Sequence, residues 1–303
     1  MFVNFDIMNT DNIASKHLGK ISSGSEYYDS SLLVAVPREE NRLCYNINSK
    51  DLPFCGFDIW HGYEFSCLTE KGLPVTRVLK IKYSCENDYI IESKSLKLYL
   101  NSFNMIRYGK DTTQCLKLCK QIIEKDLSNT LAVNVEINFI NTQKITGIYS
   151  DFTNIMNFAD ENEIYINDYK ENYKLLQINE LKYEKTYKLK FDSLRSNCRV
   201  THQPDFGDVF IYYKSKKHID ENSLVKYLTS FRSEYHFHEE CCEMIYKRLY
   251  DLLNYDDELF VSCLYTRRGG IDICPVRWSK NFQPEFVKNL LDVKIFARNG
   301  IKQ

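Results

Sequence analysis

A nine-residue segment occurs twice in this chain, and the two copies stand 128 residues apart. Residues 95–103 have the sequence SLKLYLNSF and residues 223–231 have SLVKYLTSF, so six of the nine positions are identical. Each copy places Leu, Tyr, Leu and Phe at positions i, i+3, i+4 and i+7, which is the spacing of one face of a helix. A match at a constant offset favours a tandem duplication, so we expect a chain of two related halves.

The two copies lie in the same order of predicted elements. Around each copy, the apolar spacing predicts a strand, the repeated helix, a second helix and a closing strand. The predicted elements are residues 78–83, 96–103, 115–123 and 131–139 in the first half, and 209–213, 224–231, 242–253 and 259–265 in the second. Because the strands do not alternate singly with helices, this order indicates an α+β fold and not a doubly wound parallel sheet. We expect modules at residues 1–150 and 186–303, joined by a segment at 151–185 with some structure of its own.

Composition and charge argue against several classes of protein. The 303 residues carry 40 Lys and Arg against 41 Asp and Glu, so no global basic field exists to hold a nucleic-acid backbone. The longest apolar runs, such as residues 32–36, are far shorter than the roughly 20 residues that cross a bilayer. The first residues lack the features of a secretion signal. We therefore expect a cytoplasmic protein that binds neither nucleic acid nor membrane.

The eleven cysteines need a separate explanation. Their number is odd, they are spread through the chain, and no two form a Cys-x-x-Cys pair. This distribution differs from the dense, even sets of disulfide-rich secreted domains, and it gives no support to a zinc ribbon or a thioredoxin-like centre. It fits a reducing cytoplasm and leaves open whether a single cysteine carries out chemistry.

The first candidate for such a cysteine is Cys198, which lies in the polar segment 194–208 just before a predicted strand. Loops in such positions commonly carry functional residues. Arg195 and Arg199 flank Cys198, and positive charge beside a thiol favours the nucleophilic thiolate. The alternative is that Cys198 is a small buried apolar residue, as most cysteines are.

Asp205 stands seven residues after Cys198 in the same segment. Pro204 and Gly207 predict a turn here, because proline fixes φ and glycine supplies the backbone freedom that turns require. Such a turn would bring the Asp205 carboxyl back to the Cys198 thiol.

A second cluster, residues 236–243, lies at the start of the second helix of the C-terminal half. Three interpretations of it stay open. Glutamates in a first helical turn complement the helix dipole. His236, His238 and the adjacent cysteines offer metal ligands, although their spacing is not that of known structural zinc sites. A carboxylate such as Glu239 can also accept two adjacent N–H donors, which the edge of a guanine or pterin presents.

Two further segments lie beside predicted elements. Residues 90–95 bring Glu92, Ser93 and Lys94 to the start of the first repeated helix, where they bind a ligand or only cap the helix. Residues 265–272 place two arginines beside two glycines, which suits either phosphate binding or a solvated turn. No G-x-G-x-x-G motif follows a strand, and neither a G-x-S-x-G elbow nor a P-loop occurs. The sequence therefore contains none of these three motifs.

Taken together, these segments resemble the long, two-module form of the NADPH-dependent 7-cyano-7-deazaguanine reductases, the nitrile reductases of the queuosine pathway. The likeness begins at Leu18, covers most of the chain and is weakest at residues 151–185. The main matching segments are LPFCGFDIW at 52–60, IESKSLKLYLNSFN at 91–104, SNC at 196–198, THQPD at 201–205, FHE at 237–239 and YTRRGG at 265–270. The departures are minor: Cys67 replaces an aromatic residue, Phe206 stands where Trp is usual, and Cys274 stands where Asn is common.

The resemblance implies tandem tunnelling-fold modules, each an antiparallel sheet with two helices on one face, in a homodimer whose sites form where modules meet. It implies NADPH-dependent reduction of a deazaguanine nitrile to an aminomethyl group through a covalent cysteine thioimide, a step toward tRNA modification. No metal takes part. The implied site residues are Cys198 as nucleophile and Asp205 as proton donor; Ile91, Glu92, Ser93, His238 and Glu239 for the substrate; and Ser93, Lys94, Arg268 and Gly269 for NADPH.

The competing class is a zinc-dependent hydrolase of the same fold, such as a cyclohydrolase-type enzyme that acts on pterins or GTP. It requires zinc bound through cysteine and histidine, so its metal content and its sensitivity to chelators distinguish it. A non-enzymatic binding protein is a third alternative, and it gives no reason for Cys198 and Asp205 to match the active pattern.

Overall fold

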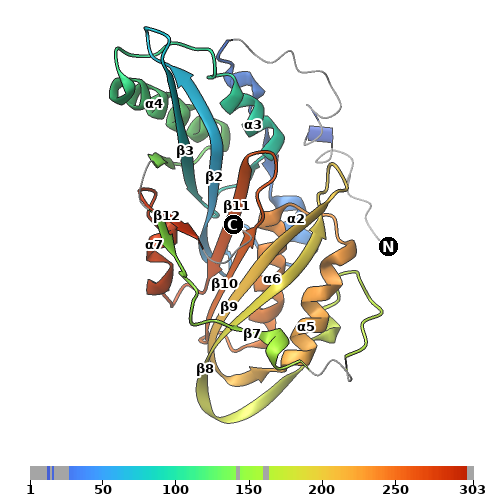
Figure 1. Ribbon diagram of the computed structural model, residues 1–303. Helices are drawn as coiled ribbons and strands as arrows, with labels where there is room; N and C mark the ends of the chain where they lie inside the picture. Colours follow the sequence, from blue (N-terminus) through green and yellow to red (C-terminus); the bar gives the residue numbers. More distant parts are fainter. Residues whose placement is uncertain (1–11, 14–15, 17–26, 141–143, 160–163, 299–303) are drawn as a thin grey trace.

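A computed structural model describes residues 12–13, 16, 27–140, 144–159 and 164–298. In this part of the chain an eight-stranded sheet has the order β5-β3-β2-β11-β10-β9-β8-β7, with the helices packed beside it (Figure 1). Two further pairs of strands, β1 with β4 and β6 with β12, lie outside it. The predicted α+β class is confirmed. The strands are β1 (Ala35–Pro37), β2 (Cys55–Leu68), β3 (Pro74–Ser84), β4 (Tyr89–Ile91), β5 (Val135–Ile140), β6 (Lys144–Thr146), β7 (Thr153–Asn154), β8 (Ile178–Asn197), β9 (Pro204–Ile219), β10 (Glu258–Tyr265), β11 (Ile271–Trp278) and β12 (Phe296–Arg298).

The predicted order of strand, helix, helix and strand occurs in both halves, as β3-α3-α4-β5 and as β9-α5-α6-β10. No helix in the described ranges has both the length and the apolar character that spanning a bilayer requires. The α-helices are α2 (Glu39–Cys44), α3 (Ser93–Asn101), α4 (Thr112–Leu131), α5 (Glu221–Thr229), α6 (His238–Leu252) and α7 (Lys288–Leu291), and the 3-10 helices are η1 (Ser30–Leu32), η2 (Ile155–Asn157), η3 (Tyr173–Leu175), η4 (Ser230–Ser233) and η5 (Glu285–Val287).

The repeated residues make the same hydrogen bonds in both copies. The Ser95 hydroxyl donates to the carbonyl oxygen of Glu92 at 2.7 Å, and the Ser223 hydroxyl donates to that of Asp220 at 2.7 Å. Glu92 and Asp220 are also the N-caps of their helices. The last serine of each copy donates to the carbonyl three residues before it, at 2.6 and 2.7 Å. The sequence repeats because the same capped helix is built twice.

One predicted boundary is wrong. The alternation from Leu131 to Phe139 predicted a strand, but α4 continues through Leu131, which is buried against the sheet. Ala132 then ends the helix in the left-handed conformation, with φ of 52°, and β5 starts only at Val135. A buried helix end and a half-buried strand show similar apolar spacing over so few residues.

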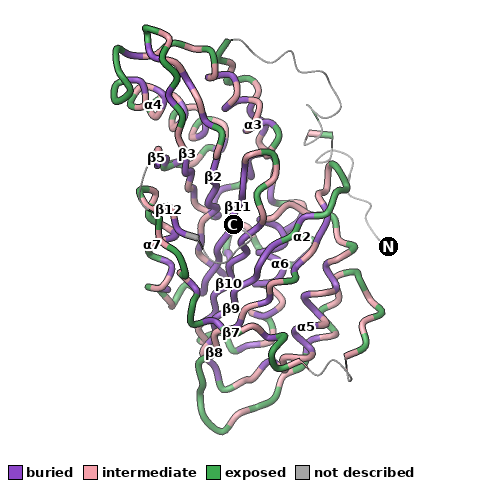
Figure 2. The backbone as a smooth tube through the Cα atoms, in the orientation of Figure 1, coloured by how far each residue is buried: buried purple, intermediate pink, exposed green. Residues whose placement is uncertain are grey.

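The two halves share one sheet and one helix-covered face. Strand β2 pairs antiparallel with β11, from Gly62 opposite Ile271 to Cys55 opposite Trp278, so the sheet continues from one half into the other. Alternate residues of each strand face opposite sides. One side packs against α3, α4, α5 and α6, and the other packs against the C-terminal region around α7 (Figure 2). This arrangement brings the starts of α3 and α6 to the same face of the sheet.

The segment at 151–185 contains β7, η2 and η3, and the long strand β8 begins within it at Ile178. Strand β8 therefore crosses the predicted boundary between the connecting segment, which ends at residue 185, and the second module, which starts at residue 186. Its first half is exposed, whereas its second half, toward Asn197, is largely buried beside β9. The buried end of β8 leads into the site described next.

Candidate active site

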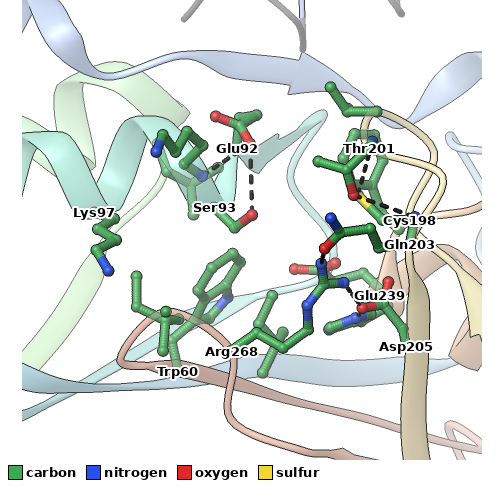
Figure 3. A pocket seen from close by; sticks show the side chains of 18 of the residues that line it. Trp60, Glu92, Ser93, Lys97, Cys198, Thr201, Gln203, Asp205, Glu239 and Arg268 are labelled. Carbon is green, nitrogen blue, oxygen red and sulfur yellow. Dashed lines mark hydrogen bonds and ion pairs between the residues drawn. The ribbon is translucent and has the colours of Figure 1, made fainter. Parts of the chain in front are cut away.

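A pocket of about 510 Å³ lies between the two halves of the chain (Figure 3). One side comes from the start of α3 and from β2, the other comes from the β8–β9 hairpin and the start of α6, and the residues before β11 complete the lining. A single chain supplies both sides. Every residue that the sequence analysis assigned to catalysis, substrate or NADPH lines this pocket, namely Ile91, Glu92, Ser93, Lys94, Cys198, Asp205, His238, Glu239, Arg268 and Gly269.

Cys198 follows β8 directly, and it is one of three cysteines that are not buried. Its backbone N–H donates to the carbonyl of Gln203 at 2.8 Å, and its carbonyl accepts from the N–H of His202 at 2.9 Å. The Thr201 N–H lies 3.5 Å from the sulfur and points a donor at it (Figure 3). A tight loop therefore holds the thiol at the pocket wall, accessible to a ligand.

The turn of this hairpin lies at residues 198–203. The sequence analysis predicted it at Pro204 and Gly207, and that prediction is wrong. Pro204 begins β9, a position in a strand where a missing N–H is tolerated. Gly207 lies within the sheet, where a Cβ would stand 3.1 Å from a carbonyl oxygen of β10. His202, with φ of 56°, takes the left-handed position in the turn. Glycine was needed for close packing and not for chain reversal.

The arginines beside Cys198 contact other groups. Arg195 donates to the carbonyl of Arg232 at 2.5 Å, and Arg199 pairs with Glu40 at 3.5 Å and Glu240 at 3.4 Å. The expectation that these two cations favour the thiolate therefore gains no support from their contacts.

Asp205 is the second residue of β9, and its carboxylate lies between His238 and Arg268. One oxygen lies 3.2 Å from Nε2 of His238, and the other accepts from the guanidinium of Arg268. Burial raises the pKa of Asp205, but the hydrogen bonds and charges of His238 and Arg268 outweigh burial and hold the pKa below its ordinary value. The carboxyl is thus ionised at neutral pH, and it must receive a proton before it can donate one.

His238 is fixed by more than its contact with Asp205. Its ring stacks on Tyr265, with 3.7 Å between ring centroids and 3° between the planes. Tyr265 is fully buried at the end of β10. The imidazole therefore has a set orientation at the start of α6, beside Glu239.

Glu239 is almost completely buried, with 1% of its surface exposed, although it lines the pocket. Its Oε1 atom has no hydrogen-bond partner among the described residues. Burial, followed by the negative charge of Asp58, raises the pKa of Glu239 to about 8. Asp58 belongs to a buried charge cluster in which Arg277 contacts it at 2.9 Å. A buried acceptor without a partner is costly, so this carboxyl is suited to receive N–H donors from a ligand.

The carboxylate of Glu92, unlike that of Glu239, is hydrogen-bonded to the backbone through both of its oxygens. It is the N-cap of α3, and its carboxylate accepts from the N–H of Lys94 at 2.8 Å and from the N–H of Ser95 at 2.6 Å. The capping role left open by the sequence is therefore observed. Burial raises the pKa of Glu92, and these two hydrogen bonds offset part of that effect.

Cations lie on both sides of the pocket. The guanidinium of Arg268 donates to Asp205 and, at 3.0 Å, to the side chain of Gln203, so it faces inward (Figure 3). Lys94 is exposed at the start of α3. Lys97, one helical turn later, lies 3.6 Å from Glu64 and beside Gly269. The α3 side of the pocket can therefore hold anionic groups such as phosphates.

The cluster at 236–243 uses its groups separately. His236 pairs with Glu234 at 3.0 Å and with Glu240 at 3.5 Å. Cys242 donates to backbone carbonyls of two neighbouring strands. In the described ranges, the groups of three or more potential metal ligands lie elsewhere and include neither His236 nor His238. The zinc site that a cyclohydrolase-type enzyme requires therefore finds no ligand set in this pocket.

Two family models match this chain. One, described as nitrile reductase, 7-cyano-7-deazaguanine-reductase N-terminal, matches residues 25–139, and the other, described as QueF-like protein, matches residues 204–284. The NADPH-dependent 7-cyano-7-deazaguanine reductase of Colwellia psychrerythraea is 37% identical over 293 residues, which cover 93% of this chain and 98% of that protein. The protein of the same name from Rickettsia akari is 40% identical over 268 residues, which cover 88% and 93%. The chain belongs to the family of NADPH-dependent 7-cyano-7-deazaguanine reductases.

The sequence analysis assigned no role to several residues that line the pocket. Lys97 stands three residues after Lys94, a spacing that places both on one helix face and could have indicated it. Trp60 lines the pocket from β2, and its buried indole N–H has no partner among the described residues. The sequence analysis included Gln203 only as part of the THQPD segment at 201–205. Its contact with Arg268 depends on how the hairpin folds over the strand ends.

Proposed function

We propose that this chain uses NADPH to reduce the nitrile of 7-cyano-7-deazaguanine to an aminomethyl group, the activity that the names of its relatives give to those proteins. The observation that carries the proposal is one pocket lined by an accessible thiol, a carboxylate and a buried acceptor that has no partner among the described residues. Cys198, Asp205 and Glu239 supply these three groups. Each corresponds to one requirement of nitrile reduction.

Cys198 is the proposed nucleophile. A nitrile carbon is a weak, soft electrophile, and a thiolate attacks such a centre better than a hydroxyl does. Attack forms a carbon–sulfur bond, and the electron pair released from the triple bond goes to the nitrile nitrogen. The product is a thioimide covalently bound to Cys198.

Asp205 is proposed to carry the proton in this step. The lowered pKa of Asp205 means that the carboxylate starts ionised and can accept the proton of the Cys198 thiol. It then passes this proton to the nitrile nitrogen, so the addition is balanced without an outside acid. His238, 3.2 Å from the carboxylate and stacked on Tyr265, orients it for both transfers.

Glu239 is proposed to hold the heterocycle. A guanine-like edge presents two adjacent N–H donors, and a carboxylate can accept both at once. Because Oε1 has no partner in the described part of the chain, a bound ligand can satisfy this buried atom. Glu92, Ile91 and Ser93 line the same pocket from the start of α3 and complete the substrate side.

The residues present fit NADPH. Ser93, Lys94 and Gly269 lie at the α3 side, where the ammonium group of Lys97 adds positive charge that suits phosphates. Arg268 reaches the same pocket but donates to Asp205, so we assign it to the boundary between cofactor and substrate. NADPH supplies hydride when bound, and a nitrile requires two such transfers to become an amine. The unsaturated intermediates hydrolyse in water, so the pocket must exclude water while the substrate and NADPH are bound.

The two halves are proposed to be tunnelling-fold modules at residues 1–150 and 186–303, and the active form a cytoplasmic homodimer. The repeated order of elements and the shared helix-covered face support this division. Because one chain supplies both walls of the pocket, each protomer of such a dimer carries a complete set of the proposed residues.

The proposed activity is tested by mixing the protein with 7-cyano-7-deazaguanine and NADPH, following NADPH absorbance and identifying the product by mass. We expect two NADPH oxidised per aminomethyl product and no turnover by Cys198→Ala. Cys55→Ala is the matched control, because Cys55 is also partly exposed but lies outside the pocket. NADPH oxidation that does not depend on the nitrile, or undiminished turnover by Cys198→Ala, would overturn the proposal.

A further inference from the structure

Three cysteine sulfur atoms converge far from the pocket chemistry. Cys67 lies near the end of β2, and Cys115 and Cys119 lie one turn apart on α4. All three side chains are completely buried. Their Sγ atoms lie within 4.8 Å of one another, and those of Cys67 and Cys115 are 3.1 Å apart. None of the three lines the pocket, so the proposed reaction gives no reason for this arrangement.

We propose that Cys67, Cys115 and Cys119 form a binding site for one soft d10 metal ion, Zn²⁺ or Cu⁺. Sulfur atoms bound to one such ion at about 2.3 Å stand roughly 3.8–4.0 Å from each other. The observed separations, from 3.1 Å to at most 4.8 Å, bracket this value, so small side-chain rotations produce the required triangle. Thiolate ligands select these ions over Mg²⁺ and Ca²⁺, which prefer oxygen.

The hydrogen bond with Cys119, followed by burial, raises the pKa of Cys67, and burial raises the pKa of Cys115, so a metal ion must displace these protons when it binds. Two features of the surroundings lower the cost of forming the thiolates. Cys115 is the fourth residue after Asp111, the N-cap of α4, so it stands in the positive end of the helix dipole. Arg77 on β3 contributes a positive charge that acts on Cys67. Three thiolates around a divalent ion leave one negative charge in excess, and these two features offset it.

An ion can reach the cluster from the start of α4. Residues 112–114, which precede Cys115, are exposed, so the cluster lies directly beneath the first turn of the helix. Brief opening of that turn, the least restrained part of a helix, exposes the sulfurs without unfolding the sheet. A disulfide is the competing use of the same atoms, but it engages only two of the three sulfurs and requires an oxidant.

The test uses the full-length chain with Cys198→Ala, so that the accessible pocket thiol does not bind the metal. Reduced, metal-free protein is titrated with Zn²⁺ or with Cu⁺ in separate arms against a chromophoric chelator. We expect one equivalent per chain in the arm of the preferred ion, and X-ray absorption showing sulfur ligands at about 2.3 Å. Cys119→Ala in this background should weaken binding more than about tenfold, because removal of a ligand exceeds the loss of an outer contact.

The matched control is Cys85→Ala in the same background, which removes another fully buried cysteine outside the cluster and should leave the affinity unchanged. Absence of binding in both arms, equal affinity with and without Cys119, or a shell of oxygen and nitrogen overturns the proposal. So does a Cys67–Cys115 disulfide in protein handled without reductant, combined with no metal uptake after reduction. The X-ray absorption result requires no change within the cluster, so it decides the question even where Cys119→Ala fails to fold. The outcome is independent of the proposed reaction.

Discussion

Two buried carboxylates face the same pocket, and they differ in what holds them. Glu92 begins α3 with its carboxylate bound to two backbone N–H groups, at 2.8 and 2.6 Å. Glu239 is the second residue of α6, and its Oε1 is unpaired among the described residues. Both are at least 96% buried. Position at a helix start therefore does not by itself decide whether a carboxylate caps the helix or is available for a ligand.

The difference arises from position: Glu92 is the N-cap of α3, whereas Glu239 is the second residue of α6, whose N-cap is Phe237. At α6 the cap is supplied by Glu240, which accepts from the N–H of Phe237 at 2.9 Å and is also close to His236. Glu239 takes no part in this cap, and it lines the pocket. At α3 no second acid follows, and Glu92 must cap the helix itself. We infer that the first site is built for rigidity and the second for exchange of hydrogen bonds with substrate.

The largest effect is expected when the unpaired acceptor, Glu239, is replaced. Glu239→Gln should weaken 7-cyano-7-deazaguanine binding by about 100-fold, because the wild-type carboxyl accepts both N–H groups once it has lost its proton on binding, whereas glutamine offers one acceptor and one donor. The same change should raise the melting temperature of the ligand-free protein at pH 7.5. With a folded pKa of about 8 and an ordinary value of 4.5, the neutral carboxyl's contribution to stability is present below pH 4.5 and falls away up to pH 8.

Substrate titration and thermal melts of both proteins check this prediction. Glutamine does not ionise, so Glu239→Gln avoids the loss of folding stability that ionisation of the buried Glu239 carboxyl causes. Unchanged affinity, or a lower melting temperature for Glu239→Gln, would contradict the assignment of this carboxyl to ligand binding.

The second-largest effect is expected when the paired carboxylate, Glu92, is removed. Glu92→Ala should destabilise the protein by about 1 kcal/mol, the usual loss for an N-cap, and should also raise KM because α3 forms one wall of the pocket. Asp220→Ala is the matched control, since Asp220 caps the repeated helix α5 by accepting from the N–H of Ser223 at 2.8 Å and does not line the pocket. Denaturant unfolding and steady-state kinetics measure both. Equal KM in the two variants would limit Glu92 to a structural role.

The smallest effect concerns the cap at α6. Burial opposes the charge of His236, but the hydrogen bonds that its imidazolium donates to Glu234 and Glu240 raise the pKa of His236 to about 9. Its contribution to stability is therefore complete below pH 6.5 and is lost as the pH rises through 9. The difference in melting temperature between wild type and His236→Gln should shrink across that range. A difference that stays constant from pH 6 to 9.5 would show that the imidazolium pairs are not formed.

Much of the arrangement was predictable because it depends on local spacing. The repeated nine residues fixed two capped helices, and apolar alternation located the strands beside them. These features follow from short segments whose own residues determine their structure. The ten proposed site residues were expected from the resemblance to the reductase family and not from spacing, and they line one pocket.

Other features depend on contacts that the sequence does not display. Gly207 signals a turn by composition, yet its small size serves packing against β10. Arg199 stands beside Cys198 in the chain, but its charge meets Glu40 and Glu240. Whether a carboxyl such as Asp205 starts ionised is set by His238 and Arg268, which lie 33 and 63 residues away in the chain. Long-range partners decide charge state, and spacing alone does not reveal them.

The central claim is that Cys198 attacks the nitrile while Glu239 holds the ring. Intact mass of the protein incubated with 7-cyano-7-deazaguanine, without NADPH, tests it most directly. We predict one covalent substrate molecule per chain, mapped by peptide analysis to Cys198, absent in Cys198→Ala and slow to form in Glu239→Gln. No adduct on the wild-type protein, or an undiminished adduct on Cys198→Ala, would contradict the account.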